Sequence, residues 1–262
     1  MSDAGPVRAT VVSVACLLRS LPLLFRASPR TPLRMLGIVA FDTLHVLRHS
    51  RPLSRRRITE LAMFLDFEGC ANAVWDRKAP PFSECQATRR WLARAGLDVC
   101  VQQYLHRLRA LETARPAVGG DRRCFDAVRS YREGVARLAL ATAAAMALNP
   151  DGREQDRGEA HTDADVDTLF RILMQCQIID DVLDYAEDAS AGLPSFLTAS
   201  ASLSQALDLT ADAARAYAEG SGRTRKSVFP LRLALWGFTV AATRILRLAG
   251  RRHRYARQVA HR

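Results

Sequence analysis

The chain has 262 residues, of which 48% are apolar and 25% are charged, so it can bury a sizeable core and is far too apolar for a disordered protein. Its 38 basic residues outnumber 27 acidic ones and give a formal charge of +11. Seven arginines and no acid lie between Arg244 and Arg262, which leaves the preceding residues with only +4. A basic tail on a nearly balanced body argues against a nucleic-acid-binding domain, and no nucleic acid partner is expected.

The six cysteines lie at least 15 residues apart and form no Cys-x-x-Cys or Cys/His cluster. This spacing predicts free thiols in a reducing compartment rather than a zinc site or a disulfide framework. The apolar runs Ala9–Leu18 and Leu233–Thr243 are both shorter than the roughly 20 residues that cross a bilayer. We therefore expect a cytoplasmic protein that can lie against a membrane surface.

From residue 82 onward, prolines divide the chain into long uninterrupted intervals. Apolar residues in each interval recur every three or four positions, which is typical of helices. We predict an all-α fold of about eight helices, with one domain over residues 1–250 and a basic tail over 251–262. The intervals are 82–115, 117–149, 151–193, 195–229 and 231–262.

Five carboxylates crowd into nine residues near the middle of one interval, and on a helix they fall within about 120° of its surface. No basic residue occurs between Arg171 and Arg215. A solvated acidic face normally alternates with Lys or Arg, and crowded carboxylates repel one another unless a cation lies among them. The pattern therefore favours a Mg²⁺ site, with its bound phosphate or diphosphate substrate, over a solvated face. The acids are Asp180, Asp181, Asp184, Glu187 and Asp188.

A second polar stripe lies upstream, where Glu68, Asn72 and Asp76 are spaced four residues apart. On its own this stripe is equally well explained by chance. Two facing stripes, however, would clamp a metal–diphosphate group between two helices. Arg77 and Lys78 follow at once, either to pair with diphosphate oxygens or as exposed charges at the end of a helix.

Three segments resemble motifs of one enzyme superfamily. Gln177-Ile-Ile-Asp-Asp-Val-Leu-Asp184 resembles the second aspartate-rich motif, QxxDDxxD, of polyprenyl diphosphate synthases. Asp180, Asp184 and Asp188 also match the ligand spacing of squalene and phytoene synthases and of class I cyclases. Tyr131-Arg-Glu-Gly-Val-Ala136 is similar to the YxxGVA segment of squalene and phytoene synthases. Residues 60 to 200 thus resemble the class I isoprenoid (trans-prenyltransferase and terpene) synthases, nearest to the squalene/phytoene synthase branch.

The resemblance implies a helical bundle of the isoprenoid synthase type around a central apolar cavity. It also implies Mg²⁺-dependent ionisation of an allylic prenyl diphosphate, release of diphosphate, and prenyl coupling or cyclisation. Asp180, Asp184 and Asp188 would be the catalytic, metal-binding carboxylates. The further metal ligands would be Asp181, Glu68, Asn72 and Asp76, and substrate contacts would include Arg77 and Lys78.

Tyr131, Gly134 and Val135 would shape the cavity wall in such a synthase, Gly134 by allowing close approach. Simple helix–helix packing explains Gly134 equally well. Gln177, one turn before Asp181, would hold a ligand or a water, with packing as the alternative.

Two other functions stay open. The upstream stripe lacks the usual pair of aspartates, which favours a catalytically silent subunit of the same fold that binds or scaffolds at a membrane surface. The arginines of 251–257 favour a protein that works through an anionic surface, for which lipid headgroups fit better than nucleic acid. The sequence leaves open the prenyl chain length, condensation against cyclisation, and the oligomeric state.

Overall fold

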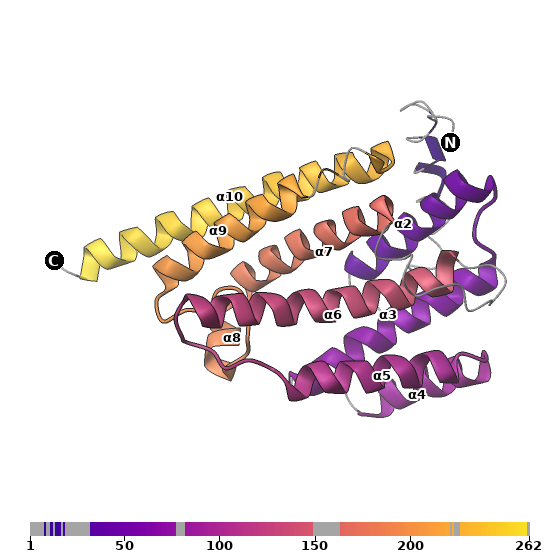
Figure 1. Ribbon diagram of the computed structural model, residues 1–262, viewed down its shortest axis with the longest axis horizontal. Helices are drawn as coiled ribbons and strands as arrows, with labels where there is room; N and C mark the ends of the chain where they lie inside the picture. The colour runs from indigo at the N-terminus through magenta and orange to yellow at the C-terminus, as the bar shows by residue number, and fades with distance from the viewer. Residues whose placement is uncertain are drawn as a thin grey trace. The chain divides into compact units, whose positions relative to one another are not determined.

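The computed structural model describes residues 8, 11–12, 14–16, 18, 32–76, 82–148, 163–220, 222 and 226–260. The regular elements in this part of the chain are helices (Figure 1). A single isolated β-bridge pairs Gly120 with Ser200 in the described residues. The predicted all-α fold class is confirmed. The helices are α2 (Pro32–His49), α3 (Arg55–Trp75), α4 (Phe82–Arg94), α5 (Asp98–Thr113), α6 (Arg122–Leu148), α7 (Ala164–Leu183), α8 (Tyr185–Ala191), α9 (Leu203–Glu219) and α10 (Phe229–Ala260).

Several helices from α4 onward begin or end close to a proline. Pro230 is the second residue of α10, where a missing N–H costs nothing because the first turn has no partner for it. Gly192 ends α8 with a left-handed backbone (φ 65°), and Pro194 follows it. Ser202 begins α9, and its side chain accepts a hydrogen bond from the backbone N–H of Gln205 at 3.2 Å.

The chain falls into two compact units. Unit 1 comprises Met1–Arg109, Leu138–Val166 and Val228–Pro230, and unit 2 comprises Ala110–Arg137, Asp167–Ser227 and Leu231–Arg262. The basic segment expected as a separate tail is helical as far as Ala260 and continues α10 without interruption.

In unit 1, α3 packs against α2 and α4. The rings of Phe64 and Phe67 on α3 meet the Tyr104 ring of α5 edge-on, with centroids 5.2 and 6.4 Å apart. Arg34 on α2 donates to the Asp66 carboxylate at 2.6 Å. Aromatic packing and one partly buried ion pair therefore hold α3 in place.

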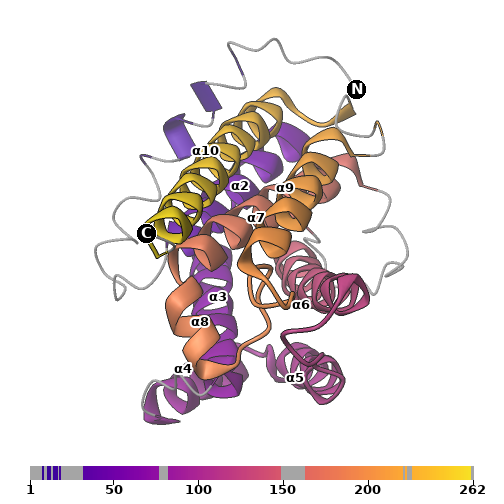
Figure 2. The ribbon, with the colours of Figure 1, turned by 90° about the vertical axis from the view of Figure 1, so that its left-hand side faces the viewer.

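In unit 2, α9 lies beside α10 in both ribbon views (Figures 1 and 2). Gln175 on α7 donates to the carbonyl of Ala214 on α9 at 2.7 Å. Arg171, also on α7, closes the end of α9, because its guanidinium donates to the carbonyls of Tyr217 and Ala218. These carbonyls belong to the last turn of α9, where helical partners are missing.

The apolar run near the C-terminus is longer than the sequence suggested. Over Phe229–Tyr255, α10 is long and apolar enough to cross a membrane, judged by length and composition alone, and only 17% of its most apolar stretch is buried. The sequence expectation considered only Leu233–Thr243, which Arg232 and Arg244 bound, whereas the helix continues beyond both arginines. Core helices of soluble proteins can have the same length and composition, but they are mostly buried.

The packing of Arg171 against Gly220 generates a stability prediction. Gly220 has φ 57° and ψ −171°, and a Cβ there would overlap the Arg171 guanidinium. We expect Gly220→Ala to lower the free energy of unfolding by about 3 kcal/mol, because strain and overlap add. Gly192→Ala, also at positive φ but with open space around its Cβ, should cost only about 1 kcal/mol. Equal losses in urea unfolding would contradict the expected difference between the two glycine positions.

Candidate functional site

The predicted acid helix bends at Asp184, where α7 ends and α8 begins. Helical hydrogen bonds continue across the bend, from the N–H of Asp184 to the carbonyl of Asp180 at 2.8 Å and from Asp188 to Asp184 at 2.9 Å. Asp180, Asp184 and Asp188 therefore occupy successive turns, as their spacing predicts. We call these three residues the acid ladder.

The five acids of the predicted stripe differ in how deeply they are buried. Asp181 and Asp188 are buried, whereas Asp180 and Glu187 are exposed and Asp184 is half-buried. Consecutive helical residues point about 100° apart, which is enough to turn one toward the core and its neighbour toward solvent. The sequence interpretation placed both kinds on one wide stripe.

Asp181 differs from the acid ladder because two hydrogen bonds hold its carboxylate inside the protein. One carboxylate oxygen accepts from Arg132 of α6 at 2.5 Å, and the other accepts from the backbone N–H of Phe196 at 2.7 Å. Burial raises the pKa of Asp181 to about 6, although Arg132 and the Phe196 N–H oppose that rise. The negative charges of Asp188 and Asp180 raise the pKa of Asp181 further, because both carboxylates lie close to it. Both oxygens of Asp181 thus accept a hydrogen bond within the protein, which suits a residue that positions its neighbours, and its place among the metal ligands stays a prediction.

The turn after α8 is a buried hydrogen-bonded loop. The hydroxyl of Thr198 donates to the carbonyl of Leu193 at 2.5 Å and accepts from the N–H of Ser195 at 2.8 Å. The N–H of Gly119 donates to the carbonyl of Thr198 at 2.9 Å. This loop fixes the Phe196 N–H that Asp181 accepts. Sequence reasoning missed Phe196 and Arg132 as partners of the acids, although Arg132 lies inside the YxxGVA-like segment.

Tyr131 is buried and takes part in a polar triad. Its hydroxyl donates to Glu112 at 2.8 Å and accepts from Arg115 at 3.2 Å. Burial and the neighbouring Glu112 carboxylate raise the pKa of Tyr131 to about 12, against the effect of Arg115. Gly134 lies against α5, where a Cβ would come within 3.0 Å of a Leu111 methyl carbon. Gly134 therefore serves helix packing.

The two remaining wall and ligand candidates differ in what surrounds them. Val135 is half-buried on α6. Gln177 is half-buried on α7, one turn before the acids, and its Oε1 atom is buried with no hydrogen-bond partner among the described residues. A buried amide oxygen without a donor is a position that a cation or a water would stabilise.

The upstream stripe belongs to unit 1, at the end of α3. Asn72 donates to the Glu68 carboxylate at 2.5 Å, and burial raises the pKa of Glu68 to about 7 despite that hydrogen bond. The Oδ1 atom of Asn72 is buried and has no partner among the described residues. Asp76 is half-buried and ends the helix. Arg77 and Lys78 lie outside the described residues.

The acids offer the type of ligand atom that a divalent cation prefers, but those in the described residues do not form a complete ligand set. Carboxylate and amide oxygens are the ligands that Mg²⁺ prefers. Each stripe offers carboxylates and one buried amide oxygen that has no partner in the described part of the chain. This oxygen is Asn72 Oδ1 in the upstream stripe and Gln177 Oε1 beside the acids of α7. No group of three or more His, Cys, Asp or Glu side chains in the described residues is placed to hold a metal ion by itself. Such a site would need oxygens from a substrate, which is how Mg²⁺ is commonly bound with phosphates.

No protein-family model, curated protein or solved structure matches the chain.

The two contacts of Asp181 generate a prediction for stability without added metal. Asp181→Ala leaves the Arg132 guanidinium and the buried Phe196 N–H without their acceptor, so it should lower the free energy of unfolding by about 3 kcal/mol. Asp181→Asn keeps one acceptor oxygen and should lose less. Asp180→Ala, next in the chain but exposed, should stay within about 0.5 kcal/mol of the wild type. Similar losses for Asp180→Ala and Asp181→Ala in urea unfolding would contradict this division of roles.

Proposed function

We propose that this chain is a class I isoprenoid synthase that ionises a prenyl diphosphate, releases diphosphate, and couples or cyclises the prenyl chain. One observation carries the proposal. The ion pair between Arg132 and Asp181 joins the YxxGVA-like segment on α6 to the acid segment on α7. The two paired residues lie 49 residues apart in the chain. Each segment resembles a synthase motif independently of the other. Their contact supports a common site.

The acid ladder would hold the cation in this proposal. Asp180, Asp184 and Asp188 present carboxylates on three successive turns, and the Oε1 atom of Gln177 lies on the turn before them. Bound Mg²⁺ would act as a Lewis acid on the diphosphate and favour its departure. Asp181 would position the ladder by fixing the end of α7 to α6 and to the loop after α8.

The substrate's apolar chain would need a wall free of competing polar groups. Tyr131 has its hydroxyl committed to Glu112 and Arg115, so it presents no free donor to a carbocation. Val135 lies one turn beyond on the same helix. Both side chains fit the apolar wall that the resemblance implies, and Gly134 contributes packing rather than space.

A second function is favoured by the same acids. The described residues contain no three-ligand metal group, and the upstream stripe has Asn72 where a carboxylate would add charge. A catalytically silent subunit would keep the helical fold and bind a prenyl compound or a partner without ionisation. Binding of a prenyl diphosphate without diphosphate release would identify this alternative.

The α10 helix supports an association with the membrane surface in either case. This helix exposes Trp236 and Leu248 and ends in arginines. Exposed apolar side chains beside basic ones are typical of helices that lie in the interface of an anionic membrane. A cytoplasmic protein held at the membrane surface would meet prenyl substrates where they partition.

The proposal predicts metal-dependent release of diphosphate from allylic substrates of ten, fifteen or twenty carbons. Asp184→Ala should reduce release at least about 100-fold, since it removes a ligand of the ion that stabilises the leaving group. Its helix content and melting temperature should stay close to those of the wild type, because Asp184 is only half-buried and caps no helix through its side chain.

Glu187→Ala is the matched control for that assay. Glu187 is an exposed acid of the same α8 helix that lies outside the ladder, so its loss should leave release unchanged. Equal release by wild type and Asp184→Ala, or equal loss in both variants, would contradict a role for the ladder. No release by a folded wild-type protein with any chain length would favour the silent subunit.

A further inference from the structure

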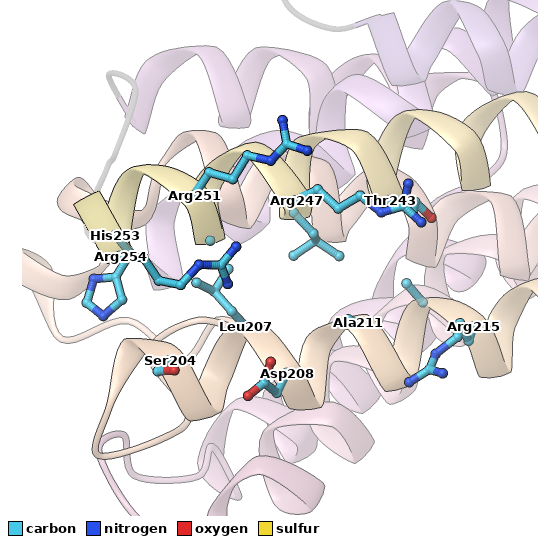
Figure 3. A pocket seen from close by; sticks show the side chains of 13 residues that line it. Ser204, Leu207, Asp208, Ala211, Arg215, Thr243, Arg247, Arg251, His253 and Arg254 are labelled. Carbon is cyan, nitrogen blue, oxygen red and sulfur yellow. The ribbon is translucent and has the colours of Figure 1, made fainter. Parts of the chain in front are cut away.

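A pocket of about 460 Å³ lies between α9 and α10 in unit 2, and none of the predicted site residues lines it (Figure 3). Its floor is apolar, formed by Leu207, Ala214 and Leu246. Its walls are polar and mostly basic. The polar lining residues are Ser204, Asp208, Arg215, Thr243, Arg247, Arg251, His253 and Arg254.

The charge of this pocket is strongly positive, because four arginines face one carboxylate, Asp208. Arg215 already pairs with Asp212. Neither Arg247 nor Arg254 forms an ion pair with any residue that the structure describes. Figure 3 shows both side chains reaching from α10 over the hollow, with Arg215 at one end and His253 at the other. Unpaired guanidinium groups around one hollow attract an anion with several acceptor oxygens.

His253 supplies an independent sign of a missing partner. Its Nε2 atom is buried, and no described residue forms a hydrogen bond with it. A buried polar atom of this kind costs free energy until a ligand or water completes it. An imidazole N–H, like a guanidinium group, can donate to a phosphate oxygen.

Trp236 and two of the pocket arginines occupy one side of α10. Trp236 and Arg254 are five helical turns apart and point about the same way, and Arg247 lies about 20° from both. Trp236 is 65% exposed. On the other side of the helix, Leu235 is buried against the protein. A surface that enters the membrane interface would therefore carry the mouth of the pocket with it.

We infer that the α9–α10 pocket is a binding site for the phosphate headgroup of an anionic membrane lipid. Arg247 and Arg254 grip the phosphate oxygens, and His253 adds a further donor at one end. Trp236, on the same side of α10, seats the helix among the headgroups and upper acyl chains. The inference rests on the membrane association proposed above and is independent of prenyl chemistry.

The test compares two variants of the full-length protein with equal charge loss on the same helix. Arg247→Gln with Arg254→Gln removes two pocket arginines. Arg244→Gln with Arg252→Gln removes two exposed arginines that do not line the pocket. Binding is measured by sedimentation with phosphatidylcholine vesicles, with and without phosphatidic acid, and folding by circular dichroism and melting temperature.

We expect the wild type to prefer vesicles that contain phosphatidic acid. The pocket pair should weaken that binding at least about tenfold more than the outer pair. Each basic residue near an anionic membrane strengthens binding about tenfold or less through general attraction, and specific phosphate contacts add to this effect. Equal weakening by both folded pairs would overturn the inference, since diffuse charge would then explain it.

A second arm separates lipid from soluble phosphate. Inorganic pyrophosphate is titrated into the protein by calorimetry without vesicles. The wild type could bind pyrophosphate but not vesicles, and the pocket pair could lose the pyrophosphate binding. This result would overturn the lipid assignment and identify the pocket as a site for a soluble phosphate ester. No binding in either arm would overturn both the pocket and the membrane association, whereas diphosphate release by the acid ladder would be unaffected.

Discussion

The ion pair between Arg132 and Asp181 sets the arrangement of the acid site. It fixes the end of α7 to α6, and the second carboxylate oxygen fixes the same point to the loop after α8 through Phe196. With both oxygens engaged, Asp181 stays buried while Asp180, one residue earlier, faces solvent. The acid ladder can then extend from a rigid base. Breaking a buried pair of this kind is costly because it strands a charge, so the contact constrains everything built on it.

Unit 2 separates its charges along the chain. The acids gather on α7 and α8, whereas the arginines gather on α10 and around the pocket that it forms with α9. Each group suits a different ligand: a cation with a diphosphate for the acids, a lipid phosphate for the arginines. A synthase with a membrane-soluble substrate would use both. The binding of a lipid by α10 would keep the enzyme where its substrate is, without any direct part in the chemistry.

Helical period and proline placement were enough to predict the all-α fold, because both act locally along the chain, but not where each helix begins and ends. The acid ladder was also predictable, since Asp180, Asp184 and Asp188 follow the helical repeat. The burial of Asp181 was not predictable, because periodicity assigns a direction but does not say where the core lies. Its partner Arg132 is 49 residues away, and only the tertiary fold brings them together. The α9–α10 pocket was missed for the same reason, as its arginines were visible only as a basic tail.

The most direct test of the acid ladder follows Mn²⁺, a spectroscopic substitute for Mg²⁺, by electron paramagnetic resonance. The protein is titrated with Mn²⁺ in the presence and absence of a prenyl thiodiphosphate that resists ionisation. We expect tight Mn²⁺ binding only when the diphosphate group is present, because the protein alone offers no complete ligand set in its described residues. Asp184→Asn should abolish that binding and Glu187→Gln should preserve it. Mn²⁺ binding that ignores Asp184, or no binding with the substrate analogue, would contradict the ladder as a metal site.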